Sequence, residues 1–375
     1  MVSYKTAGFT VRSKKLVAFT VLVGVFFISN ALLASRPMLS WYGLSKVLEY
    51  TFLILYLART VREKFQLEHI ALLFSCSALF ESLLAISQYI HQGSLNGIFY
   101  FFGERMFSGV TPGIANASIA GDLILRPYGT FPHPNVLAGY LLISLLFVWF
   151  FLRKSVSNWL QLLSAVSLIV ISIALLLTLS RIAIAIWVVF VIVLLLKHMN
   201  LKLRNTKQKV IAGLLLIVAL GIVFMSPISH ELVARFSQTS FTEESFTERT
   251  VLTSAAFTLF QQHPLLGVGL DNFLPSLAPL QTPMPLNLYL QPVHNIFLLV
   301  ATELGFIGFF LFLELLFASA QEILHKQKEV RNFLFLALGI IIITGMFDHY
   351  WLTLQQGQLL FATIFGLSWI KIEKS

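Results

Sequence analysis

The chain has one cysteine, Cys76, among 375 residues, and only 11% of its residues are charged. A single cysteine excludes a disulfide within the chain and a metal site built from cysteines. A charged fraction this low, together with 57% hydrophobic residues, lies outside the usual range of soluble domains. Long apolar runs take the place of charge, and they predict a protein that crosses a membrane several times.

Each crossing of a hydrocarbon core of about 30 Å needs roughly 20 helical residues. The stretch 159–196 is apolar for 38 residues, which is too long for one crossing, so a turn is expected at Ser180-Arg181. The sequence therefore predicts an all-α polytopic membrane protein with about ten transmembrane helices, at residues 16–34, 44–60, 69–90, 135–152, 159–178, 182–197, 210–226, 295–318, 332–349 and 357–371.

Lysines and arginines divide unevenly between the two sets of alternating loops. Because cytoplasmic loops retain positive charge, the richer set marks the cytoplasmic side and places both termini there. The net charge of +9 is thus a topology signal, and its spread over several membrane flanks argues against nucleic-acid binding. The richer set holds 19 of the 26 basic residues, and the other holds 7: Arg36, Lys46, Arg105, Arg126, Arg181, Arg235 and Arg249.

The predicted helices divide the chain into membrane helices 1 to 7 (residues 1–226), a large, partly helical outer loop (227–293) and membrane helices 8 to 10 (294–375). The first apolar run is longer than that of a signal peptide, so an uncleaved helix is expected. A second outer loop, 91–134, is rich in glycine, proline and aromatic residues. We expect an interfacial or re-entrant segment in it, with a sugar-binding surface as the alternative.

Arg181 is embedded in apolar sequence on both sides. An arginine at membrane depth costs about 2.5–3.5 kcal/mol on insertion scales, so it is normally paired and commonly functional. Its partner would be an acid from another helix, a carbonyl turn or an anionic substrate. Snorkelling to the outer surface is the alternative.

Arg249 lies in the large outer loop, directly after Ser245-Phe246-Thr247-Glu248, which fits a capping box. Apolar residues then recur at helical spacing until His263-Pro264, so a helix is expected there. Arg249 precedes Leu252 by three residues and falls on the apolar face. It therefore points toward the membrane, unless it pairs with a neighbouring glutamate at the surface.

His294 lies in the segment Gln291-Pro292-Val293-His294-Asn295, which precedes an apolar run. Proline suits the first turn of a helix, so His294 is expected at the mouth of a membrane helix. A neutral imidazole there can take a proton from a hydroxyl, and the helix dipole favours an anion nearby. The alternative is an interfacial histidine bonded to a loop carbonyl. Glu303, about 180° away on the helix, is expected to pair within the bundle.

Three more polar residues border the predicted outer connections. Arg126 opens segment 126–135, where three prolines and a glycine force turns and exclude regular helix. Asp348 and His349 lie among aromatic residues in the last outer connection. They border either the same outer cavity or an aromatic interface belt.

Four stretches carry a resemblance to a known family. They are GTFPHPNVLAGYL (129–141), TLSRIAIAIWVVF (178–190), RTVLTSAAFTLFQQHPLLGVGLDNF (249–273) and HNIFLLVATELGFIGFFLFL (294–313). In this order they resemble the O-antigen ligase and polymerase superfamily of bacterial envelope glycosyltransferases, and the last two are the specific ones. The first three helices match only in hydropathy.

The resemblance implies a glycan donor linked to undecaprenyl diphosphate, a glycan, lipid or protein acceptor, and transfer to its hydroxyl at the outer face of the bacterial cytoplasmic membrane. It implies that Arg181 and Arg249 bind the diphosphate and that His294 is the catalytic base. Asn295, Arg126, Asp348 and His349 are candidate acceptor-binding or supporting residues. No cofactor is expected, and no cluster of outward-facing acids suits a metal, so activity should persist in chelator.

Several interpretations stay open at this stage. Ligation, polymerisation and glycan transfer to protein share these motifs, and many ligases have twelve spans whereas this chain supports ten. The ELGFIG sequence after His294 is also reminiscent of cell-wall polymerases. A transporter or flippase of lipid-linked glycans would place ionisable residues near the bilayer midplane on broken helices, often in repeated halves. The polar residues here lie mainly at helix ends and in one late loop.

Overall fold

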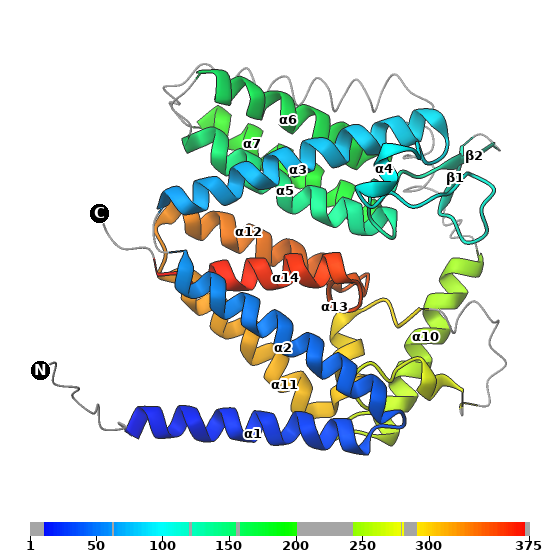
Figure 1. The fold of residues 1–375 in the computed structure, drawn as a ribbon, viewed down its shortest axis with the longest axis vertical. Coiled ribbons are helices and arrows are strands. Elements are labelled where there is room, and N and C mark those ends of the chain that lie inside the picture. Colours follow the sequence, from blue (N-terminus) through cyan, green and yellow to red (C-terminus); the bar gives the residue numbers. More distant parts are fainter. Residues whose placement is uncertain are drawn as a thin grey trace, which may run out of the picture. The chain divides into compact units, whose positions relative to one another are not determined.

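The structure is a computed structural model that describes residues 11–61, 64–119, 122–154, 158–200, 243–278, 280 and 291–371. These residues are mostly helical (Figure 1). The helices are α1 (Val11–Leu33), α2 (Pro37–Thr60), α3 (Lys64–His91), α4 (Ile98–Phe101), α5 (Pro134–Lys154), α6 (Asn158–Leu177), α7 (Arg181–Asn200), α10 (Glu243–Gln262), η1 (Pro275–Leu277), α11 (Ile296–Leu324), α12 (Lys328–Gly345), α13 (Tyr350–Thr353) and α14 (Gln355–Ser368).

Four helices within the described ranges are long and apolar enough to cross a membrane, which supports an all-α membrane protein. They match four of the predicted crossings and are Gln66–His91, Pro134–Leu152, Trp159–Leu177 and Ile296–Leu324. The apolar helices Thr20–Leu33 and Arg181–Val193 are shorter.

Three further predicted spans overlap the helices α2, α12 and α14. The predicted span 210–226 lies outside the described residues, as do residues 227–242, 279 and 281–290 of the outer loop 227–293. The total of ten crossings and the division into three parts therefore stay predictions. The turn expected at Ser180-Arg181 is confirmed, because α6 ends at Leu177 and α7 begins at Arg181.

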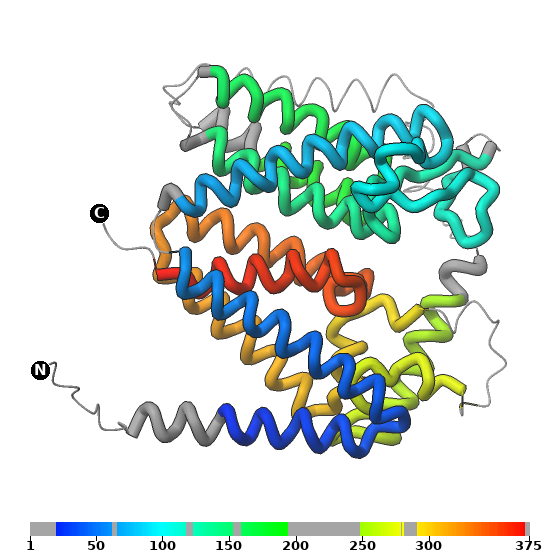
Figure 2. The backbone as a smooth tube through the Cα atoms, in the orientation of Figure 1, coloured from blue at the N-terminus to red at the C-terminus, as the bar shows by residue number. Residues whose placement is uncertain are grey.

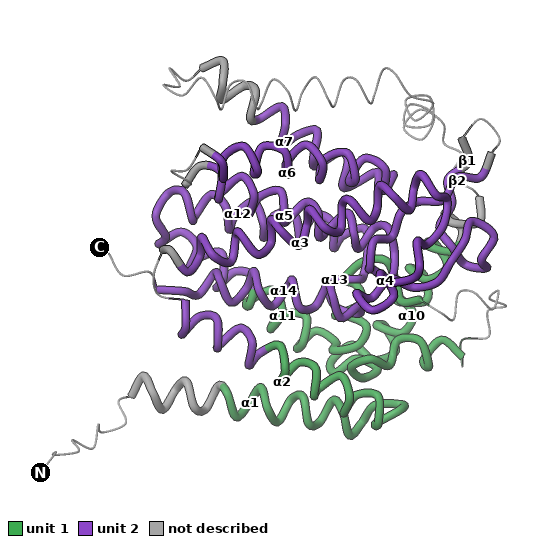
Figure 3. The backbone as a smooth tube through the Cα atoms, turned by 45° about the horizontal axis from the view of Figure 1, so that its top comes forward, with its two compact units in different colours: residues 1–50, 248–315 green, residues 51–247, 316–375 purple. Residues whose placement is uncertain are grey.

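The chain forms two compact units (Figure 3). Unit 1 comprises residues 1–50 and 248–315, and unit 2 comprises residues 51–247 and 316–375. The helices α2 and α11 contribute to both units, since the division falls within each of them.

Helix α5 is the central helix of unit 2. It packs against α3, α6, α7, α12 and α14, and the apolar window of Pro134–Leu152 is 83% buried (Figure 2). The sequence explains this position, because α5 is apolar on all sides and a helix of that kind belongs inside a bundle. Its first residue is Pro134, whose fixed φ and missing N–H suit that position.

Unit 1 is built around a cluster of buried apolar residues from α10, the loop that follows it, and the first turns of α11. Its members include Leu252, Ala256, Leu259, Phe273 and Val293. The predicted apolar face of the outer-loop helix is confirmed, and so is its end before His263.

At two helix starts the residues expected to begin the helix differ from those observed, although α11 begins within one residue of the predicted span 295–318. Helix α10 begins at Glu243, so Ser245 lies inside the helix and does not cap it. Helix α11 begins at Ile296, which leaves Pro292 outside its first turn. Asn295 takes the capping position, and its Oδ1 accepts from the N–H groups of Phe297 and Leu298 at 2.9 and 3.0 Å. A short polar side chain satisfies free helix N–H groups directly, which a proline ring cannot do.

The loop 91–134 contains the only pair of β-strands within the described ranges. Its strands β1 (Asn116–Ile119) and β2 (Asp122–Leu125) form an antiparallel pair, with Ala117 opposite Ile124. The short helix α4 also lies in this loop. Segment 126–135 has no regular structure before α5 begins, as its prolines predict.

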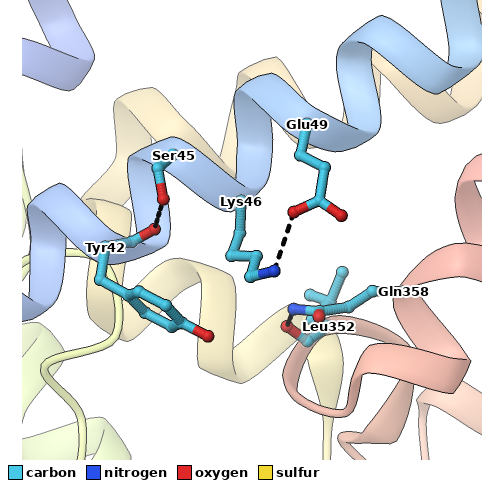
Figure 4. A network of polar contacts seen from close by, with 6 residues as sticks. All are labelled: Tyr42, Ser45, Lys46, Glu49, Leu352 and Gln358. Carbon is cyan, nitrogen blue, oxygen red and sulfur yellow. Dashed lines mark hydrogen bonds and ion pairs between the residues drawn. The ribbon is translucent and has the colours of Figure 1, made fainter.

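Figure 4 shows hydrogen bonds local to each unit. On α2, Lys46 Nζ lies 2.8 Å from Glu49 Oε2, one helical turn away, and Ser45 Oγ donates to Tyr42 O at 2.6 Å. In unit 2, Gln358 Nε2 donates to Leu352 O at 2.6 Å, next to the junction of α13 and α14. The Lys46 pair is exposed, so water and salt screen it.

Candidate active site

Helix α11 is broken at Gly305, whose φ of 64° and ψ of −167° are not helical. The break leaves backbone groups without partners inside the helix, and the loop after α10 supplies them. Four hydrogen bonds join the two segments: Val268 N to Thr302 O and Gly269 N to Glu303 O, both at 3.0 Å, Phe306 N to Pro264 O at 2.7 Å, and Ile307 N to Leu265 O at 3.4 Å. A break within an apolar helix is tolerated where freed backbone groups find partners in this way.

Glycines make this close approach possible. Gly267 and Gly305 both have positive φ, and a Cβ on either would overlap backbone atoms of the other segment. Gly267 faces the carbonyl of Glu303, and Gly305 faces the carbonyl of Leu265. The glycines in LLGVG and ELGFIG therefore have a packing role that spacing alone did not predict.

Glu303 lies beside the break and is 7% exposed. Its Oε2 accepts from Asp271 N at 3.0 Å and its Oε1 accepts from Phe273 N at 3.1 Å. Both side-chain oxygens are thus occupied by backbone donors of the loop. Glu303 was expected to pair within the bundle, and its side chain instead accepts hydrogen bonds from the loop after α10.

Asn30 and Asn272 attach the same loop to α1 and the turn after it. Asn30 Nδ2 donates to Leu266 O at 2.7 Å and to Glu303 O at 3.0 Å, while its Oδ1 accepts from Leu270 N at 2.9 Å. Asn272 Oδ1 accepts from Arg36 N at 2.8 Å. The first predicted outer connection and the late outer loop therefore meet at one end of unit 1.

Asp271 lies in this loop with a positive φ of 56°. Burial raises the pKa of its carboxyl group above the ordinary value of 3.8, since burial disfavours the charged form.

His294 and Arg249 flank the apolar cluster of unit 1. His294 is half-buried and follows Val293, a member of the cluster, and it stands two residues before α11. Arg249 is exposed on α10, three residues before Leu252, another member. The predicted base and one predicted diphosphate ligand therefore belong to one compact unit, beside the same hydrophobic cluster.

Arg181 is half-buried at the first position of α7, in unit 2. Just before it, Thr178 O accepts a hydrogen bond from Arg126 Nε at 2.7 Å. Arg126 therefore lies next to the turn that presents Arg181. The structure brings these two predicted cations together from stretches of chain more than fifty residues apart.

Asn135 connects Arg126 to Asp348. Its Oδ1 accepts from Arg126 Nη2 at 2.8 Å, and its Nδ2 donates to Asp348 Oδ2 at 3.0 Å. A guanidinium only donates and an ionised carboxylate only accepts, so the amide has one orientation that satisfies both. Asn135 was not among the predicted site residues. The sequence feature that could have identified it is its position between a proline-rich turn and an apolar helix.

His349 is 9% exposed, and its Nδ1 lies 2.6 Å from Thr353 Oγ1. The hydroxyl of Thr353 donates to His349 O at 3.1 Å. These two contacts hold the ring of His349 against Thr353, one helical turn further on.

Two side chains of α3 hold segment 126–135 in place. Gln88 Oε1 accepts from the N–H groups of Tyr128 and Gly129 at 3.0 and 2.8 Å, and its Nε2 donates to Gly129 O at 2.9 Å. Glu81, two turns earlier, accepts from Thr130 N at 2.9 Å and from Thr130 Oγ1 at 2.6 Å. Neither residue was among the predicted site residues, although two polar residues seven positions apart stand out in an apolar helix.

These contacts bring three connections to the same end of unit 2: the loop 91–134, the turn between α6 and α7, and the turn after α12. All three were predicted to share the outer side. At the opposite end of α12, Lys326 Nζ donates to Ile370 O, so two predicted cytoplasmic connections also meet. The predicted site residues thus form two groups, one in each unit.

Across the residues that the structure describes, no three His, Cys, Asp or Glu side chains are grouped closely enough to hold a metal ion. The expectation of metal-independent activity stays a prediction.

Residues 166–313 match a family model described as O-antigen ligase. Over these residues, which are fewer than half of the chain, the sequence is similar to the O-antigen ligase family. A search of curated proteins found no match. The matched residues include Arg181, Arg249, His294, Asn295 and the break in α11, and the match supports the predicted superfamily.

The group around Arg126 extends beyond the matched residues. Arg126, Asn135, Asp348 and His349 lie outside 166–313, yet Arg126 bonds directly to Thr178 inside it. The end of unit 2 that presents Arg181 is therefore built from the matched residues 166–313 and from segments on both sides of them.

Proposed function

We propose that the protein is a membrane glycosyltransferase that moves a glycan from undecaprenyl diphosphate to an acceptor hydroxyl at the outer face of the bacterial cytoplasmic membrane. The observation that carries the proposal is the match of 166–313 to the O-antigen ligase family, with Arg181, Arg249 and His294 inside it. The apolar helices support a membrane location. Inversion at the sugar carbon, the identity of the carrier and the outward orientation are parts of the proposal.

In this mechanism, Arg181 and Arg249 bind the diphosphate through charge-assisted hydrogen bonds. They stabilise the negative charge that grows on the diphosphate as its bond to the sugar breaks. The electron pair of that bond leaves with the diphosphate, so no cofactor is needed.

His294 takes the proton of the acceptor hydroxyl as its oxygen attacks the anomeric carbon. Attack from the face opposite the diphosphate inverts the configuration. The position of His294 before a capped helix supports this role, because a helix N-terminus also favours nearby negative charge.

The test uses purified protein in nanodiscs with an undecaprenyl diphosphate glycan and candidate acceptors, in buffer containing a chelator. Free undecaprenyl diphosphate and product size are both followed. The wild-type protein should release the carrier, and His294→Ala should slow release by roughly 100- to 10,000-fold, the usual contribution of general base catalysis. Release that is unchanged in His294→Ala would overturn the assignment of the base, and release that requires a divalent metal would overturn the metal-free mechanism.

Product size separates the activities that share these motifs. A single shift of the acceptor indicates a ligase or a protein O-oligosaccharyltransferase, whereas a ladder indicates an O-antigen or exopolysaccharide polymerase. Movement of the intact donor across liposomes, without loss of its diphosphate linkage, would support a transporter or flippase instead.

A further inference from the structure

The loop between α3 and α5 exposes a group of large apolar side chains while it buries two polar ones. Six large apolar residues, each at least 60% exposed, form a patch that we call the apolar ledge: Ile98, Tyr100, Phe101, Phe102, Met106 and Val110. In the same loop Ser94 and Glu104 are each 3% exposed. Soluble surfaces have the reverse arrangement and rarely expose large apolar patches.

Hydrogen bonds of the buried polar residues fix the ledge. Glu104 accepts from Leu95 N at 2.9 Å and from Asn96 N at 2.7 Å. Ser94 Oγ donates to Phe107 O at 3.0 Å, and Ser94 N donates to the same oxygen at 2.9 Å. The apolar residues are therefore held outward on a defined backbone.

The ledge continues from the exposed side of a candidate membrane span. Helix α3 exposes Leu73, Leu83 and Ile90, and Ile90 lies one residue before its end. Apolar residues exposed along a membrane span face lipid, and the loop extends that surface beyond the span. Phenylalanine and tyrosine in such a position suit the boundary between headgroups and acyl chains.

Gln88 links the ledge to the segment that carries Arg126. Its Nε2 donates both to Glu104 Oε1 at 2.8 Å and to Gly129 O at 2.9 Å. One buried side chain, 0% exposed, therefore attaches the loop of the ledge and segment 126–135 to the same turn of α3.

We propose that the apolar ledge is inserted at the headgroup and upper acyl level of the bilayer and sets the depth of segment 126–135. Arg126 and the adjoining Arg181 turn are thereby held at the level of lipid phosphates. The insertion itself follows from the ledge alone. The role of this depth in binding a lipid-linked diphosphate donor rests on the proposed function.

Nitroxide labels test the insertion directly. In a Cys76→Ser background, single cysteines at Phe101, at Leu83 on α3 and at Lys371 after α14 are labelled in full-length protein in nanodiscs. Electron paramagnetic resonance then compares the accessibility of each label to oxygen, which concentrates in lipid, with that to a water-soluble nickel chelate. All three side chains are exposed, so labelling should leave the fold intact.

The label at Phe101 should prefer oxygen, as the label at Leu83 does, and differ from the water-exposed label at Lys371. A Phe101 label as accessible to nickel as the Lys371 label would overturn the proposal. A label shielded from both reagents would overturn it as well, since protein would then cover the ledge.

Donor kinetics test the consequence for the site. Phe101→Asp should raise KM for the lipid-linked donor, expressed as its surface fraction in the nanodisc, by at least tenfold and leave kcat within twofold. Phe101→Trp retains an interfacial side chain and should restore the wild-type KM. Equal KM values in both variants would overturn the depth-setting role. Lack of transfer in every variant would count against the proposed function and leave the label result to decide the insertion.

Discussion

Asn135 Nδ2 donates a hydrogen bond to Asp348 Oδ2 at 3.0 Å. Asn135→Asp replaces that donor with a second carboxylate, so two like charges would face each other. We expect the free energy of unfolding to fall by about 1–3 kcal/mol at neutral pH. Release of free undecaprenyl diphosphate should also slow, because a carboxylate would replace the neutral amide that connects Arg126 to Asp348. Release and thermal unfolding are measured together.

Acidification separates electrostatic repulsion from simple damage to the fold. Protonating one of the two facing carboxylates restores a donor, so Asn135→Asp should regain stability relative to wild type as pH falls. Asn295→Asp is the matched stability control, because aspartate caps a helix as well as asparagine does. A deficit in Asn135→Asp that is the same at every pH would contradict the bridging role.

Gly267→Ala and Gly305→Ala should each destabilise the protein by about 3 kcal/mol or more, because a positive φ adds strain and the new Cβ overlaps backbone. Gly339→Ala on α12 is the control, since nothing lies within 4 Å of its Cβ position. There alanine should be neutral or stabilising. Thermal unfolding in detergent measures all three. Similar melting temperatures for Gly305→Ala and Gly339→Ala would rule out the close packing of residues 264–269 against residues 302–307.

Asp271→Asn should stabilise the protein at neutral pH. Burial raises the pKa of Asp271 in the folded state above 3.8, so ionisation costs folding free energy that grows as pH rises through the window between the unfolded and folded pKa values. Asparagine removes that cost and tolerates the positive φ. The melting temperature of the variant minus that of wild type should rise with pH. A difference independent of pH would contradict burial as the cause.

Arg181→Lys and Arg249→Lys test whether the guanidinium group itself matters for donor binding. Lysine keeps the charge but loses the planar pair of donors, so KM for the donor should rise roughly 10- to 100-fold. Alanine at either position should raise it further. Donor titration in nanodiscs measures the effect, and a lysine variant with wild-type KM would show that charge alone suffices.

Sequence periodicity predicted the helices well, because a membrane span must satisfy all its backbone groups internally and therefore leaves a long apolar run. The turn before Arg181 followed from one polar interruption, and the helix that contains Arg249 followed from one apolar stripe. Helix starts were less predictable. Pro292 and Asn295 both favour a helix N-terminus, and the side chain that accepts hydrogen bonds from the free N–H groups decided the start.

The long-range polar contacts were beyond sequence reasoning. Asn135 meets Asp348 across 213 positions, and Asn30 meets Glu303 across 273. No local spacing encodes such pairs. The glycines of residues 264–269 and 302–307 were visible, but their purpose depends on a loop entering a broken helix, which only the folded chain shows.

The close packing of residues 264–269 against residues 302–307 limits how these two segments can vary among relatives. Neither segment can accept a larger residue at its glycine unless the other moves away, so the two should change together during divergence. A chimera that exchanges only one of them between distant homologues should fail to fold, whereas one that exchanges residues 264–307 as a block should be tolerated.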